Sequence, residues 1–185
     1  MPELPEVERA RARIEKAALG REIARVDDGD TWVCRPHSPG ELDDALRGAK
    51  LTEAHRQGKA MWVESDSGPV LGLHLGMAGR IVVDGEPAQN NWDRFTIEFS
   101  DGGRLALRDK RRLGRAVLEP DLSTLAPDAA EVSRARFRER VGRGTAPLKA
   151  RIMDQSVIAG VGNLLADESL WRAGLSPLRP AGDLG

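Results

Sequence analysis

The sequence contains a single cysteine, Cys34, among 185 residues. One cysteine excludes a disulfide framework and a zinc cluster built from several thiolates. No apolar run is long enough to cross a bilayer, and no signal peptide precedes the first predicted helix. We therefore expect a soluble, intracellular protein.

The chain also lacks an excess of charge of either sign, because 28 basic residues oppose 29 acidic ones and give a formal net charge of −1. Its charges are nevertheless unevenly spread. Residues 104–115 contain six basic side chains and one acid, and residues 134–151 contain seven basic side chains and one acid. This pattern predicts a basic face and an anionic partner. For residues 134–143, a solvated charged helix remains the alternative.

The first eight residues, MPELPEVE, combine an early proline with three acids. This pattern is typical of a helix start, where proline is tolerated and acids complement the helix dipole. A second reading starts from the small second residue, which favours removal of Met1 and exposes the secondary amine of Pro2. A free α-amine titrates near pH ~8, so a useful fraction is neutral and can attack an aldehyde to form a Schiff base. Glu3 is then placed to shuttle protons.

One amphipathic helix and a series of short strands are predicted for the first two thirds of the chain. Val7, Ala10 and Ile14 share one stripe of the helix 3–19, and Gly20 follows as a stop. The predicted strands are 22–26, 32–35, 51–56, 60–64, 70–75, 79–83, both arms of the hairpin RFTIEF–SDGG–RLALR, and 116–118, with a short helix at 41–48.

The hydrophobic period becomes helical from residue 133 onward. The predicted helices are 133–141, 147–154 and 163–173, and a turn-rich tail follows them. The fold class is therefore α+β: an N-terminal helix with an antiparallel β-sandwich, followed by an α-helical domain. We predict domain boundaries of 1–120 and 133–185, with a linker over 121–132.

Five separated motifs occur in a fixed order along the chain. They are PELPEVE at 2–8, QGKA with Lys59, HLGMAGR at 74–80, DKRRLG at 109–114 and MDQSVIAGVGN at 153–163. Together they resemble the bacterial formamidopyrimidine-DNA glycosylases, within the wider family that includes endonuclease VIII. The match covers essentially the whole chain. The leucine of PELPE favours the purine-lesion branch, since the endonuclease VIII branch typically has glycine there.

The resemblance implies a catalytic role for three residues and a supporting role for a fourth. The mature N-terminal proline of the family attacks C1′ of a damaged nucleoside, expels the base and drives β,δ-elimination of both flanking phosphates. Pro2 matches this proline, and Glu3 matches its proton-transfer partner. Lys59 matches a hairpin lysine beside the lesion, although an ordinary surface lysine is the alternative. Glu6 matches a helix glutamate that shapes the active site.

A base inside a duplex must be flipped out, and the vacated stack must be filled. The family fills it with three side chains, which Met77, Arg111 and Leu113 match. Leu113 departs from the pattern, because the family normally has phenylalanine there, and aromatic stacking is worth roughly 1–3 kcal/mol per base. The departure concerns opposite-base selectivity more than catalysis. A core methionine is the alternative for Met77 alone.

The loop GVGN matches a helix–two-turn–helix DNA-binding element of the family, so the resemblance implies that residues 133–185 form an incomplete domain of this type. Asn163 at a helix start can donate to phosphate, and a structural helix cap is its alternative. Lys149 matches another lysine near the DNA. His74 is expected to support the structure, with a phosphate contact as the second reading.

Family members normally continue into a zinc finger with four cysteines, and this sequence does not contain those cysteines. We therefore expect no metal and no cofactor. The chain resembles a truncated product, a fragment or a member without its finger, and these alternatives stay open.

The expected function is that of a bifunctional DNA glycosylase and AP lyase of base excision repair. Its substrate would be duplex DNA with an oxidised purine, such as 8-oxoguanine or a formamidopyrimidine, or with an abasic site. We expect a monomer with no membrane partner, in a bacterial cytoplasm at the nucleoid. The alternatives are a catalytically weak remnant that binds DNA damage and an RNA- or protein-binding module that uses the arginine-rich helix.

Overall fold

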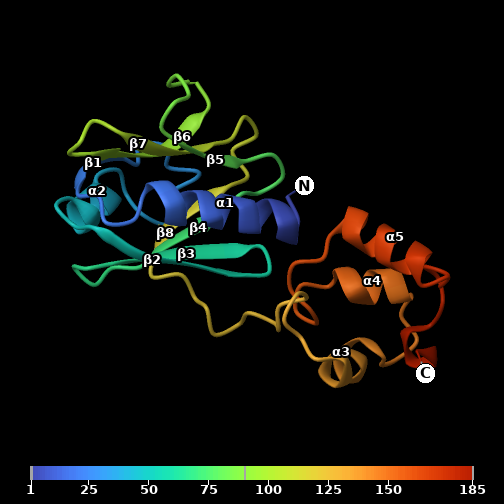
Figure 1. Cartoon of the computed structure of the whole chain (residues 1–185). Helices are drawn as coiled ribbons and strands as arrows, with labels where there is room; N and C mark the ends of the chain where they lie inside the picture. The colour runs from blue at the N-terminus through green and yellow to red at the C-terminus, as the bar shows by residue number, and fades with distance from the viewer. Residues whose placement is uncertain (1, 90, 185) are drawn as a thin grey trace. The chain divides into compact units, whose positions relative to one another are not determined.

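A computed structural model describes residues 2–89 and 91–184, which divide into two compact units (Figure 1). The first unit consists of residues up to Arg56 together with Ala60–Asp121. The second unit consists of Leu122 onward together with Gln57–Lys59. No helix of the described ranges is long and apolar enough to cross a membrane.

The first unit contains two four-stranded sheets, with strand orders β1-β6-β7-β5 and β2-β3-β4-β8. Strand pairs β1–β6, β6–β7, β5–β7, β3–β4 and β4–β8 are antiparallel. The strands are β1 (Ile23–Asp27), β2 (Leu51–Gln57), β3 (Ala60–Ser65), β4 (Leu71–His74), β5 (Arg80–Val83), β6 (Asp93–Phe99), β7 (Arg104–Arg108) and β8 (Arg115–Leu118). The second unit is helical, so the structure confirms the α+β fold class.

Helix α1 (Leu4–Ala17) contacts strands from both sheets, β5 and β3, and lies between the two layers in Figure 1. Its buried residues are Val7, Ala10 and Ile14, the stripe that the sequence predicts. Its start is fixed by a capping box, in which the Glu3 side chain accepts from the third helical N–H and Glu6 accepts from the Glu3 N–H.

The hairpin of β6 and β7 supplies the centre of the core. Phe95 is opposite Leu107 and Ile97 is opposite Leu105, and all four side chains are buried. This register follows from the alternation in the sequence, because a shift by one residue would turn the apolar side chains to the other face.

The prediction of a strand over 32–35 is wrong. These residues form turns, because the Asp30 carboxylate accepts hydrogen bonds from the backbone N–H groups of Trp32 and Val33, both at 3.1 Å. The short helix is α2 (Glu41–Leu46), which ends two residues before its predicted end.

The second unit has a small core of its own around three helices and a short 3-10 helix. The elements are α3 (Arg134–Val141), α4 (Leu148–Met153), α5 (Asn163–Arg172) and η1 (Ala181–Asp183). Its buried apolar side chains come from all four elements and from the α4–α5 loop: Val141, Leu148, Ile152, Val157, Ile158, Val161, Ala166, Leu170 and Ala181. This cluster is separate from the core of the first unit.

A buried ion-pair network fastens β6 to β7 in the first unit. The side chains of Asp93 and Arg108 are only 4% and 5% exposed, and Arg108 Nε lies 2.5 Å from Asp93 Oδ1. Arg104 Nη2 lies 2.8 Å from the other carboxylate oxygen. Burial opposes ionisation of Asp93, but hydrogen bonds from Arg108, the Gln89 N–H and Arg104 outweigh it and lower the pKa to about 2.

We expect Asp93→Asn to destabilise the protein by about 3 kcal/mol at pH 7, because the two arginines lose a buried partner. The lowered pKa means that the wild-type carboxylate contributes stability above the unfolded-state pKa, near 4, and loses it as the pH falls toward 2. The variant should therefore show a flatter stability profile between pH 4 and pH 2. Urea unfolding followed by tryptophan fluorescence measures both effects.

The control is Asp101→Asn, because the hydrogen bond from Arg21 lowers the pKa of Asp101 to about 2 as well, in an exposed pair. We expect a much smaller loss of stability at pH 7 in this variant. Equal losses of stability in the two variants would contradict the expectation that the buried Asp93 pairs stabilise the fold more than the Asp101 pair does.

Candidate functional site

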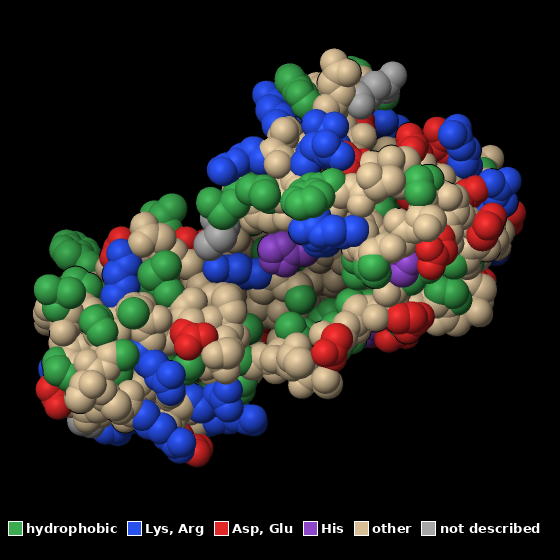
Figure 2. All heavy atoms as spheres, turned by 180° about the vertical axis from the view of Figure 1, so that it is seen from behind, with side chains coloured by type: hydrophobic (Ala, Val, Ile, Leu, Met, Phe, Trp, Pro, Cys, Tyr) green, Lys and Arg blue, Asp and Glu red, His purple; other side chains and the backbone are tan. Residues whose placement is uncertain are grey.

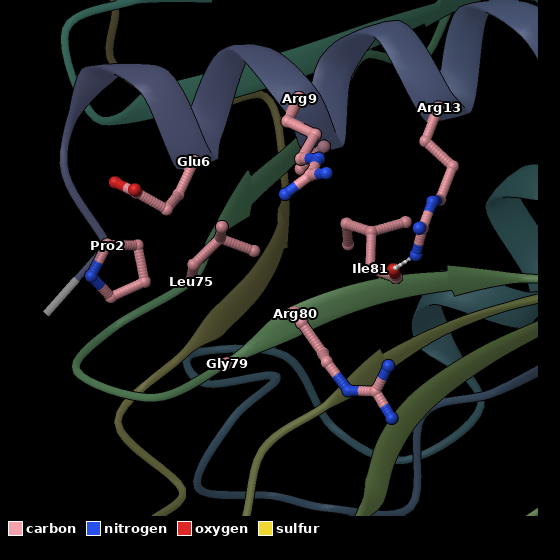
Figure 3. A pocket seen from close by; sticks show the side chains of 9 residues that line it. Pro2, Glu6, Arg9, Arg13, Leu75, Gly79, Arg80 and Ile81 are labelled. Carbon is pink, nitrogen blue, oxygen red and sulfur yellow. Dashed lines mark hydrogen bonds between the residues drawn. The ribbon is translucent and has the colours of Figure 1, made fainter.

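Pro2 lies at one end of a pocket of about 250 Å³ in the first unit (Figure 3). The pocket is bounded by one face of α1 and by the segment that leads from β4 into β5. Figure 3 shows Pro2 and Glu6 close to each other at the end where the chain enters α1. Met1, whose removal would free the Pro2 amine, lies outside the described residues.

Glu3 and Glu6 have different surroundings although they share the capping box. Glu3 is buried and Glu6 is exposed. The Glu6 Oε2 atom accepts from the Glu3 N–H at 2.9 Å, which fixes the backbone directly after Pro2. The residue that carries the candidate amine is therefore attached to a rigid helix start rather than to a loose terminus.

Two arginines of α1 line the same pocket, Arg9 and Arg13, and the sequence analysis did not identify them. With Glu6 they follow a spacing of three and four residues, which places all three on one helix face beside the buried stripe. This spacing is visible in the sequence and could have indicated that Arg9 and Arg13 share a helix face with Glu6. Arg13 Nη1 donates to the Ile81 carbonyl at 2.9 Å, whereas Arg9 has no ion pair among the described residues.

The three predicted insertion residues lie on two turns of the first unit that pack on each other. Met77 belongs to the turn between β4 and β5, and Arg111 and Leu113 belong to the turn between β7 and β8. A Cβ atom on Gly76, whose φ is +59°, would lie 2.4 Å from the Leu113 carbonyl carbon. Only glycine permits this approach, and it brings Met77 and Leu113, both exposed, to the same part of the surface.

Asp109 holds the β7–β8 turn in shape. Its fully buried carboxylate accepts from three backbone N–H groups: Oδ1 from Arg111 at 2.9 Å, and Oδ2 from Leu113 at 2.8 Å and from Gly114 at 2.7 Å. From the sequence, Asp109 was predicted only to be the single acid in a basic segment. An acid directly before a basic run that ends in glycine is the signal that indicates such a turn.

His74 stands at the end of β4 beside these turns. Its Nδ1 atom accepts from the Gly76 N–H at 3.0 Å, so Nε2 carries the proton and can act as a donor. This contact holds the bend between β4 and β5, and the phosphate contact of His74 stays a prediction.

Lys59 belongs to the second unit, at the tip of the β2–β3 hairpin. Within that unit the Gly58 N–H donates to Asp128 Oδ2 at 2.6 Å, and the Gln57 amide donates to the Ala126 carbonyl at 2.8 Å. The tip is therefore anchored through the two residues that precede Lys59, and Asp128 was not identified from the sequence.

The loop before α5 is braced by the side chain of Gln155, which was not predicted from the sequence. Gln155 Nε2 donates to the Val161 carbonyl at 2.7 Å, and its Oε1 accepts from the Gly160 N–H at 3.1 Å. Asn163 is the first residue of α5, as predicted, and is exposed. Lys149 Nζ lies 2.7 Å from Asp167 Oδ1, so its charge is partly compensated within the second unit.

Part of the basic cluster predicted over 104–115 is neutralised inside the first unit. Arg104 and Arg108 pair with Asp93, and Arg112 pairs with Asp30. Lys110, Arg111 and Arg115 have no ion pair within the described ranges. On the face shown in Figure 2, Lys and Arg side chains lie among hydrophobic and acidic ones.

Cys34 and one group of surface residues are the features that bear on metal binding. Cys34 is buried, and burial raises the pKa of its thiol to about 12, which makes it a poor ligand. Glu53, His55 and Glu64 place potential ligand atoms within 4.8 Å of one another. His55 Nε2 lies 3.1 Å from Glu64 Oε1, which is an ion pair when the imidazole is protonated.

Comparison with known proteins matches both units to one family. Residues 1–116 match the formamidopyrimidine-DNA glycosylase N-terminal domain, and residues 124–185 match the H2TH domain of the same glycosylase. Solved structures similar to this chain include Lactococcus lactis formamidopyrimidine-DNA glycosylase bound non-covalently to DNA with an AP site. That match has a TM-score of 0.86 and 26% identity and covers 99% of this chain and 73% of the other.

Curated relatives carry the same family description. The chain is 39% identical to a formamidopyrimidine-DNA glycosylase of Roseiflexus, with all of this chain and 71% of the relative covered. It is 37% identical to one from Nocardioides, with 97% and 66% covered, and 34% identical to one from Arabidopsis thaliana, with 100% and 53% covered. The chain thus spans between about half and seven tenths of the length of these relatives.

We expect Asp109→Asn to loosen the β7–β8 turn, because an amide can accept from only one side and its NH₂ group would face backbone donors. The variant should lose about 1–3 kcal/mol of stability. Trypsin should also cleave it faster after Lys110, Arg111 or Arg112, as mass spectrometry of the fragments can show. Asp101→Asn, at the tip of the β6–β7 hairpin, is the control and should leave these sites protected. Unchanged cleavage in Asp109→Asn would contradict the bracing role.

Proposed function

The chain belongs to the formamidopyrimidine-DNA glycosylase family, and we propose that it acts as a DNA glycosylase and AP lyase of base excision repair. Its proposed substrate is duplex DNA that contains an oxidised purine or an abasic site. The observation that carries this proposal is the position of Pro2, fixed by a helix cap at the end of a pocket. An N-terminal secondary amine at this place can attack the sugar of a nucleotide.

In the proposed reaction the Pro2 nitrogen forms a bond to C1′ of the damaged nucleoside while the bond from C1′ to the base breaks. The base leaves with a proton, and opening of the sugar ring gives a cationic iminium. This cation withdraws electrons, so a proton is lost from C2′ and the 3′ phosphate departs in β-elimination. A second elimination then releases the 5′ phosphate. Glu3 transfers protons to and from the sugar in this sequence.

The other site residues have proposed roles in holding the DNA open. Met77, Arg111 and Leu113 are proposed to fill the space left by the flipped nucleotide, and their two turns are fixed by Gly76 and Asp109. We propose that Lys59, His74, Lys149 and Asn163 contact phosphates and that Glu6 supports the active site. Lys59 is also assigned a catalytic role beside the lesion.

Location and cofactor use follow from the same proposal. The protein would act as a monomer on the nucleoid, in a bacterial cytoplasm. Every group used in the reaction above is a side chain or the terminal amine, so the chemistry requires no cofactor. The single cysteine cannot provide the thiolates of a zinc finger.

Borohydride trapping tests the reaction, because the reductant converts an iminium into a stable covalent adduct. Protein with a mature Pro2 terminus is incubated with a duplex carrying an abasic site or 8-oxoguanine opposite cytosine, and the products are separated on a denaturing gel. We expect an adduct with both duplexes. Trypsin digestion should place the attached nucleotide on the peptide of residues 2–9. Protein that retains Met1 is the matched control and should give no adduct at this peptide.

Glu3→Gln separates proton transfer from amine attack. Glutamine can still cap the helix, so we expect a folded protein whose 8-oxoguanine excision falls by about 100-fold. Thermal unfolding checks the fold. An adduct on a lysine instead of Pro2 would contradict the proposed nucleophile. Absence of any adduct, with a folded protein that binds the duplex, would leave a damage-binding protein without turnover.

A further inference from the structure

Trp32 is held on the surface by a rigid backbone. It is 52% exposed, although the next two residues, Val33 and Cys34, are fully buried. The Asp30 carboxylate and carbonyl accept four hydrogen bonds from the N–H groups of residues 32–34. An exposed indole on a fixed turn does not gain the stability that burial would provide. Large apolar side chains exposed in this way are typical of binding sites.

Two guanidinium groups lie over this indole. Arg35 Cζ is 3.8 Å and Arg115 Cζ is 5.9 Å from the ring centroid. Arg35 Nη1 also donates to the Trp32 carbonyl at 2.6 Å, which fixes the stack. Neither arginine has an ion pair with a carboxylate in the part of the chain that the structure describes. The group therefore combines an aromatic face with two uncompensated positive charges.

The Trp32 turn is joined to the β7–β8 turn that carries Arg111 and Leu113. Arg112 donates to both oxygens of Asp30, from Nε at 2.9 Å and from Nη2 at 2.7 Å, and the Asp30 side chain is only 9% exposed. The Ala116 N–H donates to the Val33 carbonyl at 3.1 Å. The two turns consequently form one rigid surface in the first unit.

We propose that Trp32, Arg35 and Arg115 form a second DNA contact beside the insertion turns. The guanidinium groups would bind phosphates, and the indole would pack against a neighbouring nucleotide. In proteins that bind single strands, such pairs of aromatic and cationic side chains bind nucleic acid without base readout. Duplex DNA is the favoured occupant because the surface continues from the predicted insertion residues. This inference rests on the proposed function, since it extends the same DNA-binding surface.

Fluorescence anisotropy with a duplex that carries a tetrahydrofuran abasic analogue tests the contact, because this duplex binds without reacting. We expect Trp32→Ala to weaken binding about tenfold and Trp32→Phe to stay within about threefold of wild type, since phenylalanine keeps an aromatic face. The matched control is Trp171→Ala. Trp171 is 80% exposed on α5 of the second unit, beside the acids Asp167 and Glu168, and its removal should change the Kd less than twofold.

The salt dependence of the Kd distinguishes a DNA contact from a structural role. Arg35→Ala and Arg115→Ala should each lower the slope of log K against log salt by about one, because each removes a phosphate contact. Thermal unfolding followed by circular dichroism checks that all variants are folded. Trp32→Ala binding as tightly as Trp171→Ala, or unchanged salt slopes in the arginine variants, would overturn the inference.

Failure of this inference can be separated from failure of the proposed function. If wild-type protein binds the duplex but forms no borohydride adduct, the catalytic proposal is overturned. The Trp32 contact is then still decided by the binding of the Trp32, Arg35 and Arg115 variants. Normal adduct formation with no effect of Trp32→Ala overturns the contact alone. A wild-type chain that does not bind the duplex overturns both.

Discussion

The start of helix α1 is the constraint on which the proposed chemistry depends. Val7 and Ile14 bury the helix against the sheets, and the reciprocal cap of Glu3 and Glu6 fixes the backbone directly after Pro2. A chain terminus is ordinarily its most mobile part, and a mobile amine would rarely meet a sugar in the correct geometry. The burial of α1 one turn away therefore holds the Pro2 amine in a fixed position.

Buried carboxylates organise the basic surface of the first unit. Asp93 holds Arg104 and Arg108, Asp30 holds Arg112, and Asp109 binds backbone N–H groups of the β7–β8 turn. Each acid is nearly removed from water, so losing its partners would leave an uncompensated charge. The arginines in these pairs stabilise the fold. The cations without such partners, Arg111 and Arg115 among them, remain available to an anionic ligand.

The second unit depends on a different kind of stabilisation. Its helices are short: α3 is rich in arginine, and α4 has only six residues. Helices of this length are marginal alone and need tertiary packing. Here the apolar loop residues Val157, Ile158 and Val161 complete the core that the helices begin. The same loop leads into α5 and presents Asn163, so core formation and the proposed phosphate contact use one segment.

The sequence alone determined the elements whose signals are local. The α1 stripe, the alternation of the β6–β7 hairpin and the five motifs predicted the fold class, the family and the start of α5 at Asn163, because periodicity, turn residues and motif spacing are properties of neighbouring residues. Only the tertiary structure decided which charged side chains form ion pairs within the protein and which do not. The sequence cannot show that Arg108 is buried against Asp93, that residues 32–35 turn around Asp30, or that Trp32 lies under two arginines. The Arg108–Asp93 pair forms only when β6 pairs with β7, and the contact of Arg115 with Trp32 joins residues far apart in the chain. The turn at residues 32–35 depends on hydrogen bonds to the Asp30 side chain that compete with strand formation.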